Sequence, residues 1–300
     1  MDKFEGQKFS SIWFKFDDYE IVQVDKKTYV KPKETSKIDI YNPFDKANEI
    51  LVDVLKIGRL IEQNDIKSSN KAILEFVNNY GLLGEMTYIP LNRNILEQGK
   101  VFLPKGNLVS DKEVLDTDEY IREFLKCDTN NVVSIGKGIN GSMSVAVGGE
   151  VTPFIAIDMP IEFAVVFSKS YSECLVWIMH YAHKMYRTFE AIENFHKEND
   201  DDYARQLKTI LIRDFSPSNL TCKVLVRKEP ASNPVLEWNF NSLKQAIDVI
   251  FALNATSGRK TVKACKYCGL PFYSENLKAE YCSPQCRNKA NVYKSRAKNS

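Results

Sequence analysis

Apolar and polar residues alternate along the first forty positions in the manner of half-buried strands. The alternation over 11–16 and 19–24 predicts two strands, and Asp17 and Asp18 between them predict a hairpin turn. A third strand is expected at 28–31, ended by the proline that follows it. The pattern therefore places a small sheet at the start of the chain.

The hydrophobic period changes from two to about 3.6 after Asn42. Asn42 followed by Pro43 is a typical helix start, because the asparagine side chain can cap the first turn and proline tolerates its first position. Apolar residues then recur three and four apart over 44–61. A second helix is expected over about 69–80, with Gly81 ending it.

The middle of the chain passes through irregular, β-like and helical stretches. The strongest helical pattern opens at Pro160 and continues to about His196, which predicts a long central helix. The other elements expected are an irregular stretch at 84–117, a short helix at 118–124, glycine-rich strands within 131–157, a helix ending at Ile212, strands at 220–227 and 235–240, and a helix from 242 to 253.

Small, polar and then basic residues at 254–260 indicate a linker. The pattern as a whole predicts an α+β protein in two parts. A mixed helix and strand body with the long central helix covers 1–255, and a small C-terminal treble-clef-like module covers 256–300 together with the linker. A further boundary inside the body is an option near 128–160.

Four of the seven cysteines lie close together in the C-terminal module, at Cys265, Cys268, Cys282 and Cys286. Their spacing, C-x2-C-x13-C-x3-C, is typical of a tetrahedral site in which four thiolates surround one zinc ion. We therefore predict that these residues bind one structural Zn²⁺. A chance cluster of free thiols and a redox site are the alternatives.

The residues around the cysteines predict how such a site is built. Gly269 tolerates the positive φ that closes a metal-binding knuckle after the first pair. A short hairpin is expected around 271–278, and Ser283 with Pro284 fits a helix start that places the second pair on one helical face. Four sulfurs leave no open coordination position, so the site is expected to be structural rather than catalytic.

The module also concentrates basic charge. Positions 259–300 hold ten Lys or Arg against two acids, a net charge of +8, whereas the other positions hold 31 bases and 37 acids, a net charge of −6. Basic side chains neutralise phosphates and amides read base edges, so DNA or RNA is the expected partner. The expected contacts are Lys263, Lys266, Arg287, Asn288, Lys289, Tyr293, Lys294, Arg296 and Lys298. Docking on a protein and a purely structural module are the alternatives.

Three segments resemble those of a known family. Residues 265–272 (CKYCGLPF) and 281–290 (YCSPQCRNKA) resemble the C-terminal zinc finger of bacterial CGNR-type proteins and their relatives. The residues that name this family, Cys-Gly-Asn-Arg, correspond here to Cys-Arg-Asn-Lys at 286–289. Residues 76–84 (FVNNYGLLG) resemble a stretch of larger proteins that carry the finger. The resemblance implies a divergent member or relative with a regulatory or nucleic-acid-binding role.

Three further features carry weaker signals. Positions 136–141 match G-x-G-x-x-G, but the following residues alternate like a strand, so a glycine-rich hairpin is expected rather than a dinucleotide loop. His180 and His183 lie three apart on the long helix; packing is the favoured interpretation, and half of a metal or catalytic site is the alternative. Cys174 is expected to be an inert buried thiol of the same helix.

Composition limits the class of protein. An apolar fraction of 44% with 17 Phe and 14 Tyr is typical of a globular chain with a core. No stretch has the apolar length of a signal peptide or membrane span, so a cytoplasmic protein without a membrane partner is expected. No nucleophile-elbow, Walker or paired-carboxylate motif is present, so the sequence offers no motif for an enzyme. The basic finger favours a transcription regulator or other nucleic-acid-binding regulator whose body senses a ligand, binds a protein or forms a homodimer. An enzyme targeted by its finger and a protein-interaction module are the alternatives.

Overall fold

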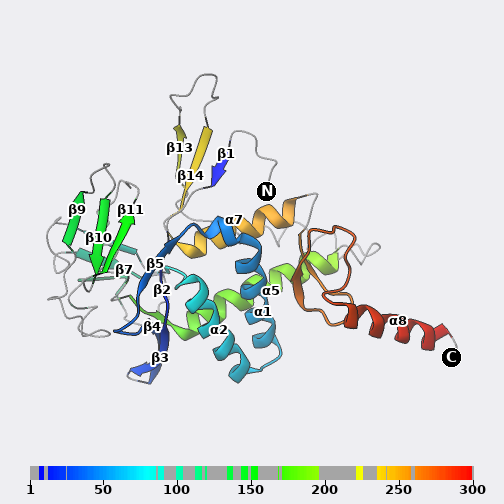
Figure 1. Ribbon diagram of the computed structural model, residues 1–300. Coiled ribbons are helices and arrows are strands. Elements are labelled where there is room, and N and C mark those ends of the chain that lie inside the picture. The colour runs from blue at the N-terminus through cyan, green and yellow to red at the C-terminus, as the bar shows by residue number, and fades with distance from the viewer. Residues whose placement is uncertain are drawn as a thin grey trace. The chain divides into compact units, whose positions relative to one another are not determined.

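The computed structural model confirms a mixed helix and strand protein with a small four-cysteine module (Figure 1). The chain divides into two compact units. Unit 1 comprises Met1–Trp13, Tyr41–Phe76 and Trp177–Ser300, and unit 2 comprises Phe14–Ile40 and Val77–Val176. The structure describes residues 7–9, 13–24, 26–85, 87–90, 99–103, 112–116, 119, 134–137, 143–147, 150–154, 168, 171–195, 221–225, 235–240, 242–257 and 261–298.

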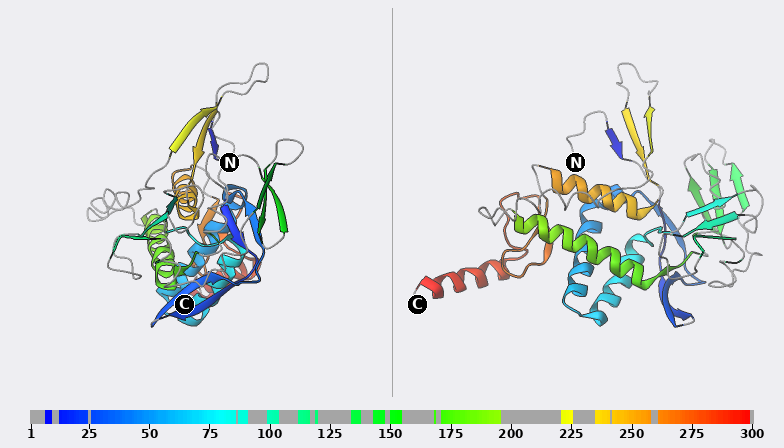
Figure 2. Two further views of the ribbon diagram at one scale, coloured as in Figure 1. Left: turned by 90° about the vertical axis from the view of Figure 1, so that its left-hand side faces the viewer. Right: turned by 180° about the vertical axis from the view of Figure 1, so that it is seen from behind.

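Helices supply most of the buried side chains of unit 1, and Figure 2 shows the course of these helices from two further sides. Among them are α1 (Ala47–Glu62), α7 (Leu243–Thr256) and the part of α5 (Leu175–Phe195) that begins at Trp177. Tyr181 of α5 donates a hydrogen bond to the buried carboxylate of Asp248 in α7 at 2.9 Å. The side chains with almost no exposed surface in these helices are Ile50, Leu51, Leu55, Ile57, Ile178, Leu243 and Ile247.

The predicted start of the first helix is confirmed. Oδ1 of Asn42 accepts a hydrogen bond from the Phe44 N–H at 3.2 Å, and the 3-10 turn η1 (Pro43–Lys46) leads directly into α1. The cap satisfies one of the N–H groups that the first turn of a helix leaves without an internal partner.

Gly58 allows α1 to approach α5 more closely than a side chain would permit. A Cβ atom at this position would lie 2.1 Å from the carbonyl oxygen of Ala182 and 2.5 Å from Cβ of Tyr186. The nearest atom belongs to the α5 backbone, so it cannot move away by a change of rotamer. The contact between these two helices therefore requires glycine.

A three-stranded sheet of unit 1 has the order β1-β14-β13. β1 (Gln7–Phe9) runs parallel to β14 (Val235–Asn239), and β13 (Thr221–Leu225) pairs antiparallel with β14. β13 and β14 confirm the strands expected at 220–227 and 235–240. The ring of Phe44 lies 5.4 Å from that of Phe9 and 4.7 Å from that of Phe240, so an aromatic cluster connects the sheet to η1.

The described residues of unit 2 form small sheets. Three strands that the sequence did not predict, β6, β7 and β8, lie in the stretch expected to be irregular, whereas the glycine-rich strands are confirmed as β9, β10 and β11. The sheets are β2 (Trp13–Phe16) with β5 (Ile38–Tyr41); β12 (Glu173–Cys174), β4 (Lys27–Pro32) and β3 (Tyr19–Val24) in that order; β6 (Thr87–Pro90), β7 (Gly99–Phe102) and β8 (Val114–Asp116); and β11 (Glu150–Phe154), β10 (Met143–Val147) and β9 (Ser134–Lys137). Antiparallel pairing of β9 with β10 confirms the hairpin expected near the G-x-G-x-x-G match.

The hairpin predicted at Asp17 and Asp18 is wrong. β2 and β3, the strands on either side, belong to different sheets. Asp17 instead contacts Lys37: its N–H donates to the Lys37 carbonyl at 3.0 Å, and its Oδ1 accepts from the Lys37 N–H at 2.8 Å. The tight turn comes one strand later, between β3 and β4, where Lys26 has a φ of 69°.

Two helix boundaries differ from those expected. α2 (Ile66–Tyr80) begins three residues earlier than predicted, because Oδ1 of Asp65 accepts from the Ser68 N–H at 3.1 Å and provides the cap. It ends as predicted before Gly81, whose φ is 87°. The long helix does not start at Pro160, since residues 173 and 174 form the strand β12 and α5 begins at Leu175. Cys174 is buried as expected, but in a strand.

Glu173 organises the loop that follows α2 in unit 2. Its carboxylate accepts hydrogen bonds from the backbone N–H groups of Leu83, Gly84 and Glu85 at 2.8, 2.6 and 2.9 Å, and from the Tyr171 hydroxyl. Burial raises the pKa of Glu173, whereas these four donors lower it and so offset part of the cost of burying the charge. The FVNNYGLLG segment therefore folds around one buried acid.

Several expected elements lie outside the described residues. These are the short helix at 118–124, most of 160–170, the helix ending at Ile212 and the turn between β13 and β14. Over the part of the chain that is described, no helix combines the length and the apolar character required to cross a membrane.

The first prediction concerns Gly58. Replacing Gly58 with Ala adds a Cβ that overlaps the α5 backbone, so we expect a loss of about 2 kcal/mol in the free energy of unfolding. At an open helical site the same change would stabilise by about 1 kcal/mol, because alanine has the higher helix propensity. Urea unfolding followed by circular dichroism measures the difference. Glu49→Ala on the exposed face of α1 is the control, and a G58A protein as stable as this control would contradict the proposed close contact.

Candidate metal centre

The first cysteine pair lies in a knuckle framed by two short strands of unit 1. β15 (Val262–Ala264) pairs antiparallel with β16 (Pro271–Tyr273), and the chain between them carries the pair. The Gly269 N–H donates to the Cys265 carbonyl at 2.8 Å, and its φ of +70° confirms the expected role of this glycine. The hairpin expected after the knuckle, at 271–278, is wrong, because Pro271–Tyr273 pairs back across the knuckle.

The second pair lies where the helix α8 (Pro284–Lys298) begins. Oγ of Ser283 accepts from the Cys286 N–H at 3.2 Å, which confirms the predicted cap. Cys286 belongs to the first turn of α8, but Cys282 lies just before it, so the two do not share a helical face as expected. Cys282 instead approaches the knuckle, where its N–H lies 3.4 Å from the Cys265 sulfur.

The geometry of the four sulfurs fits a tetrahedral metal ion. All four Sγ atoms lie within 4.8 Å of one another; Cys268 and Cys282 are 3.6 Å apart, and Cys282 and Cys286 are 3.5 Å apart. Four sulfurs at about 2.3 Å from a zinc ion would be separated by about 3.8 Å. Cys265 is buried and the other three are half-buried, so the cluster is partly shielded from solvent. The four predicted ligands therefore come together as one candidate metal site.

The knuckle favours the thiolate form of one cysteine. Burial opposes ionisation of Cys265, but the backbone N–H groups of Cys268, Cys282 and Tyr267 together lower its pKa to about 6. Burial and the neighbouring thiols raise the pKa of Cys282 to about 12. A bound cation would favour deprotonation of all four thiols.

Hydrogen bonds fix the knuckle strands to three helices of the same unit. Arg59 of α1 donates to the Cys268 carbonyl at 2.5 Å, and Glu193 of α5 accepts from the Ala264 N–H at 3.2 Å. Asn254, expected in a linker, lies in the last turn of α7, and its Oδ1 accepts from the N–H groups of Thr261 and Val262. Sequence spacing could not reveal these anchors, because Arg59 and Cys268 are 209 positions apart.

The residues expected to contact nucleic acid fall into two groups. Lys263 and Lys266 are engaged inside the module: Nζ of Lys263 donates to the Leu277 carbonyl at 2.5 Å, and Lys266 pairs with Glu280 at 2.5 Å. The rest belong to α8, which leads away from the knuckle in Figure 1. Exposed on this helix are Arg287, Asn288, Lys289, Tyr293, Lys294 and Arg296, and Lys298 is its last residue.

A cavity of about 570 Å³ lies between α5 and the module within unit 1. Acids from α5, Glu190 and Glu193, and bases from the module, Lys263 and Lys266, belong to its lining. Charges of both signs are therefore present, and the lining does not select an anionic ligand over a cationic one.

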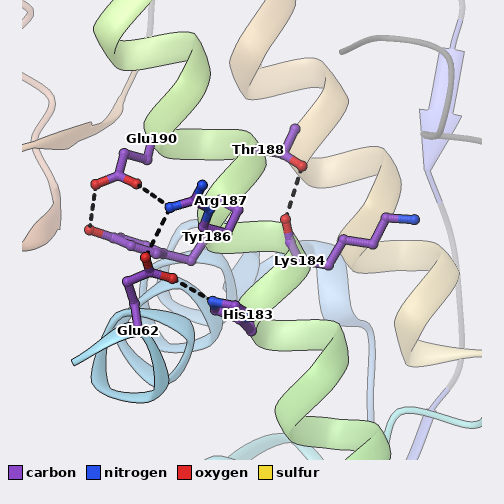
Figure 3. A network of polar contacts seen from close by, with 7 residues as sticks. All are labelled: Glu62, His183, Lys184, Tyr186, Arg187, Thr188 and Glu190. Atoms are coloured by element: carbon purple, nitrogen blue, oxygen red, sulfur yellow. Dashed lines mark hydrogen bonds and ion pairs between the residues drawn. The ribbon is translucent and has the colours of Figure 1, made fainter. Parts of the chain in front are cut away.

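A second cluster of charged residues joins α5 to the end of α1 (Figure 3). Nε2 of His183 lies 2.5 Å from Glu62, and Arg187 contacts Glu62 at 2.9 Å and Glu190 at 3.6 Å. His180 is exposed. Among the described residues, the four cysteines are the one group of three or more side chains placed to hold a metal, so the geometry assigns His183 to an ion-pair network.

Comparisons with known proteins give no relative. No protein-family model matches the chain, and no characterised protein and no solved structure matches it significantly. The resemblance to CGNR-type fingers therefore stays a prediction from the motif, and the candidate site has to be interpreted from its own geometry.

The second prediction concerns the pH dependence of the Glu62 network. The hydrogen bond from His183 lowers the pKa of Glu62, so the folded state binds this proton less tightly than the unfolded state does. The stabilisation is present above the ordinary glutamate pKa of about 4.3 and is lost as the pH falls through the lowered value. We expect Glu62→Gln to lower the urea midpoint at about pH 5.5 and to have less effect at about pH 3.

Glu49→Gln, an exposed change on the same helix, is the control for the loss of one carboxylate. A difference between wild type and Glu62→Gln that stays constant over this pH range would contradict the assigned network.

Proposed function

We propose that Cys265, Cys268, Cys282 and Cys286 hold one structural zinc ion. The sulfur separations support this proposal, and thiolates are ligands that zinc binds well. Four sulfurs fill a tetrahedral coordination sphere, so the ion would cross-link the knuckle to the start of α8 and leave no position for a substrate. Such an ion would stabilise the module by on the order of 10 kcal/mol.

We further propose that the module binds nucleic acid and that α8 is the contact element. The observation that carries this proposal is the charge of α8, which has five basic residues and no acid. Between positions 284 and 296 every residue of the helix is exposed apart from Cys286 and Ala290. A helix of this kind suits a polyanion, because lysine and arginine side chains release counterions when they neutralise phosphates.

In the same proposal the rest of the chain regulates this binding by sensing a ligand, binding a protein or forming a dimer. The bonds that Arg59, Glu193 and Asn254 make to the knuckle strands support it. Three separate helices position the knuckle, so a change in the packing of these helices would shift the start of α8.

The third prediction concerns the metal. We expect the purified protein to contain one zinc per chain by inductively coupled plasma mass spectrometry. Cys282→Ser should abolish retention of the ion, because it removes the sulfur that approaches the other three. Cys174→Ala, which removes a buried thiol outside the cluster, should keep one zinc per chain. Wild-type protein without metal, or a Cys282→Ser variant that keeps its zinc, would contradict the site.

The fourth prediction concerns the basic residues of α8. Binding of the zinc-loaded chain to fluorescent single- and double-stranded oligonucleotides of mixed sequence should weaken as salt is raised. For duplex DNA, Arg287→Ala, Lys289→Ala or Lys294→Ala should each reduce the slope of log Kobs against log salt by about 0.9, because each change removes one phosphate contact.

Lys278→Ala is the matched control, since Lys278 is an exposed lysine of the module that lies outside α8. No binding at low salt, or equal slopes for the α8 variants and the control, would overturn the proposed function. Binding of a protein by the same surface would then be the function to test.

A further inference from the structure

One side of α8 faces its own module. Ala290 is 9% exposed, Cys286 supplies a ligand sulfur, and the ring of Tyr293 lies 6.0 Å from that of Tyr267 in the knuckle. Residues advance by about 100° around a helix, so these three positions fall within about 60° of one another. They define the side of α8 that is committed to the knuckle.

The opposite side of α8 carries amides and a hydroxyl. Asn288, Asn291 and Ser295 fall within about 60° of one another and lie roughly opposite the knuckle side. Val292, which is 48% exposed, borders them. We call these four residues the amide ridge. All four are exposed, and they lie on the side of the helix away from the knuckle, so they make no apolar contact with it.

Two basic rows flank the amide ridge. Arg287 and Lys294 form one row and Lys289 and Arg296 the other, each row about 100° from the ridge. Within each row the two residues are seven positions apart, which is two helical turns or about 10.5 Å. The exposed surface of α8 is therefore a polar ridge between two parallel lines of positive charge.

We propose that α8 is a recognition helix for the major groove of duplex DNA, with the amide ridge toward the base edges and one basic row toward each phosphate strand. The inference rests on the proposed function and deepens it by naming the nucleic acid. The major groove of B-DNA is about 12 Å wide and admits a helix, and phosphates border it on both sides. Two basic rows on opposite flanks match two strands of phosphates.

The same arrangement argues against other nucleic acids. The major groove of an RNA duplex is too narrow and deep for side chains to read. Single strands are bound mainly by stacking of bases on aromatic rings, and the amide ridge contains no aromatic residue: the ring of Tyr293, although 61% exposed, lies on the knuckle side beside Tyr267. Duplex DNA is the form that uses the ridge and both rows together.

The ridge also predicts which bases are read. An asparagine amide can bond both N7 and the N6 amino group of adenine, and an exposed valine suits the methyl group of the neighbouring thymine. We therefore expect a preference for sites that contain A·T pairs, recognised from the major groove by Asn288 and Asn291.

The test uses the full zinc-loaded chain and a duplex DNA site selected from a random pool by repeated rounds of binding. Duplex RNA and single-stranded DNA of the same sequence serve as competitors. We expect the DNA duplex to bind more tightly than either. Replacing adenine by 7-deazaadenine in the selected site, which removes only the N7 acceptor in the major groove, should weaken binding roughly tenfold.

Two sets of variants separate base reading from phosphate contact. Asn288→Ala with Asn291→Ala should reduce the preference for the selected site over random duplex roughly tenfold and leave the salt slope unchanged. Arg287→Ala with Lys294→Ala, and Lys289→Ala with Arg296→Ala, should each lower the salt slope by about 1.8 and keep the preference. Zinc content and circular dichroism confirm that every variant is folded.

The outcomes distinguish the two levels of the proposal. If RNA or single-stranded DNA binds as tightly as the duplex, or if 7-deazaadenine has no effect, the major-groove assignment is overturned and nucleic-acid binding by α8 stands. If only one basic row affects the salt slope, α8 lies along one strand and the assignment is again overturned. If none of the nucleic acids binds, the proposed function fails together with it.

Discussion

The fold of the module at 261–298 depends on the close approach of four sulfurs, since few other interactions within the module hold it together. Over 261–296, where burial is described, its buried residues are Val262, Cys265, Pro271, Phe272 and Ala290, too few to form a hydrophobic core of ordinary size. Its strands have three residues each. A metal held by the four thiols would replace the missing core, because it ties the knuckle to the helix start through bonds stronger than apolar contacts.

Hydrogen bonds from the helices of unit 1 anchor the knuckle and so hold the four-sulfur cluster in place. The Arg59 guanidinium holds the carbonyl of Cys268, a residue whose own sulfur belongs to the cluster. Burial and the Glu190 carboxylate raise the pKa of the Tyr186 hydroxyl, and the same arginine, which lies beside it, offsets part of the rise. Arg59 therefore links the cysteine cluster to the contact between α1 and α5 that Gly58 makes possible. The module is held by polar contacts with helices whose positions are in turn set by close packing.

The sequence predicted local features well where one short segment determines them. Asn42, Gly81, Gly269 and Ser283 act as caps or positive-φ residues in the places expected, because caps depend on neighbours within a few positions. Prediction from the sequence failed where a contact with a distant segment determines the local structure. The hairpin at Asp17 was displaced by pairing with Lys37, and the residues before Leu175 form a strand because β4 lies beside them. The anchors of the site were beyond prediction for the same reason.

The composition of α8 connects the proposed recognition of DNA to the proposed metal binding. A helix with five bases, no acid and a single buried alanine has little to stabilise it, since its cations repel one another and no apolar face packs on a core. What holds its first turn is local: Ser283 caps it, and a metal shared by Cys286 and the other three cysteines would fix it to the knuckle. The features that make α8 a poor helix in isolation are the ones that suit it to a polyanion, because phosphates would neutralise its concentrated positive charge. If the four sulfurs hold a metal as proposed, its loss would therefore remove the orientation of both basic rows and the amide ridge at once, although Cys286 is the one proposed ligand on α8.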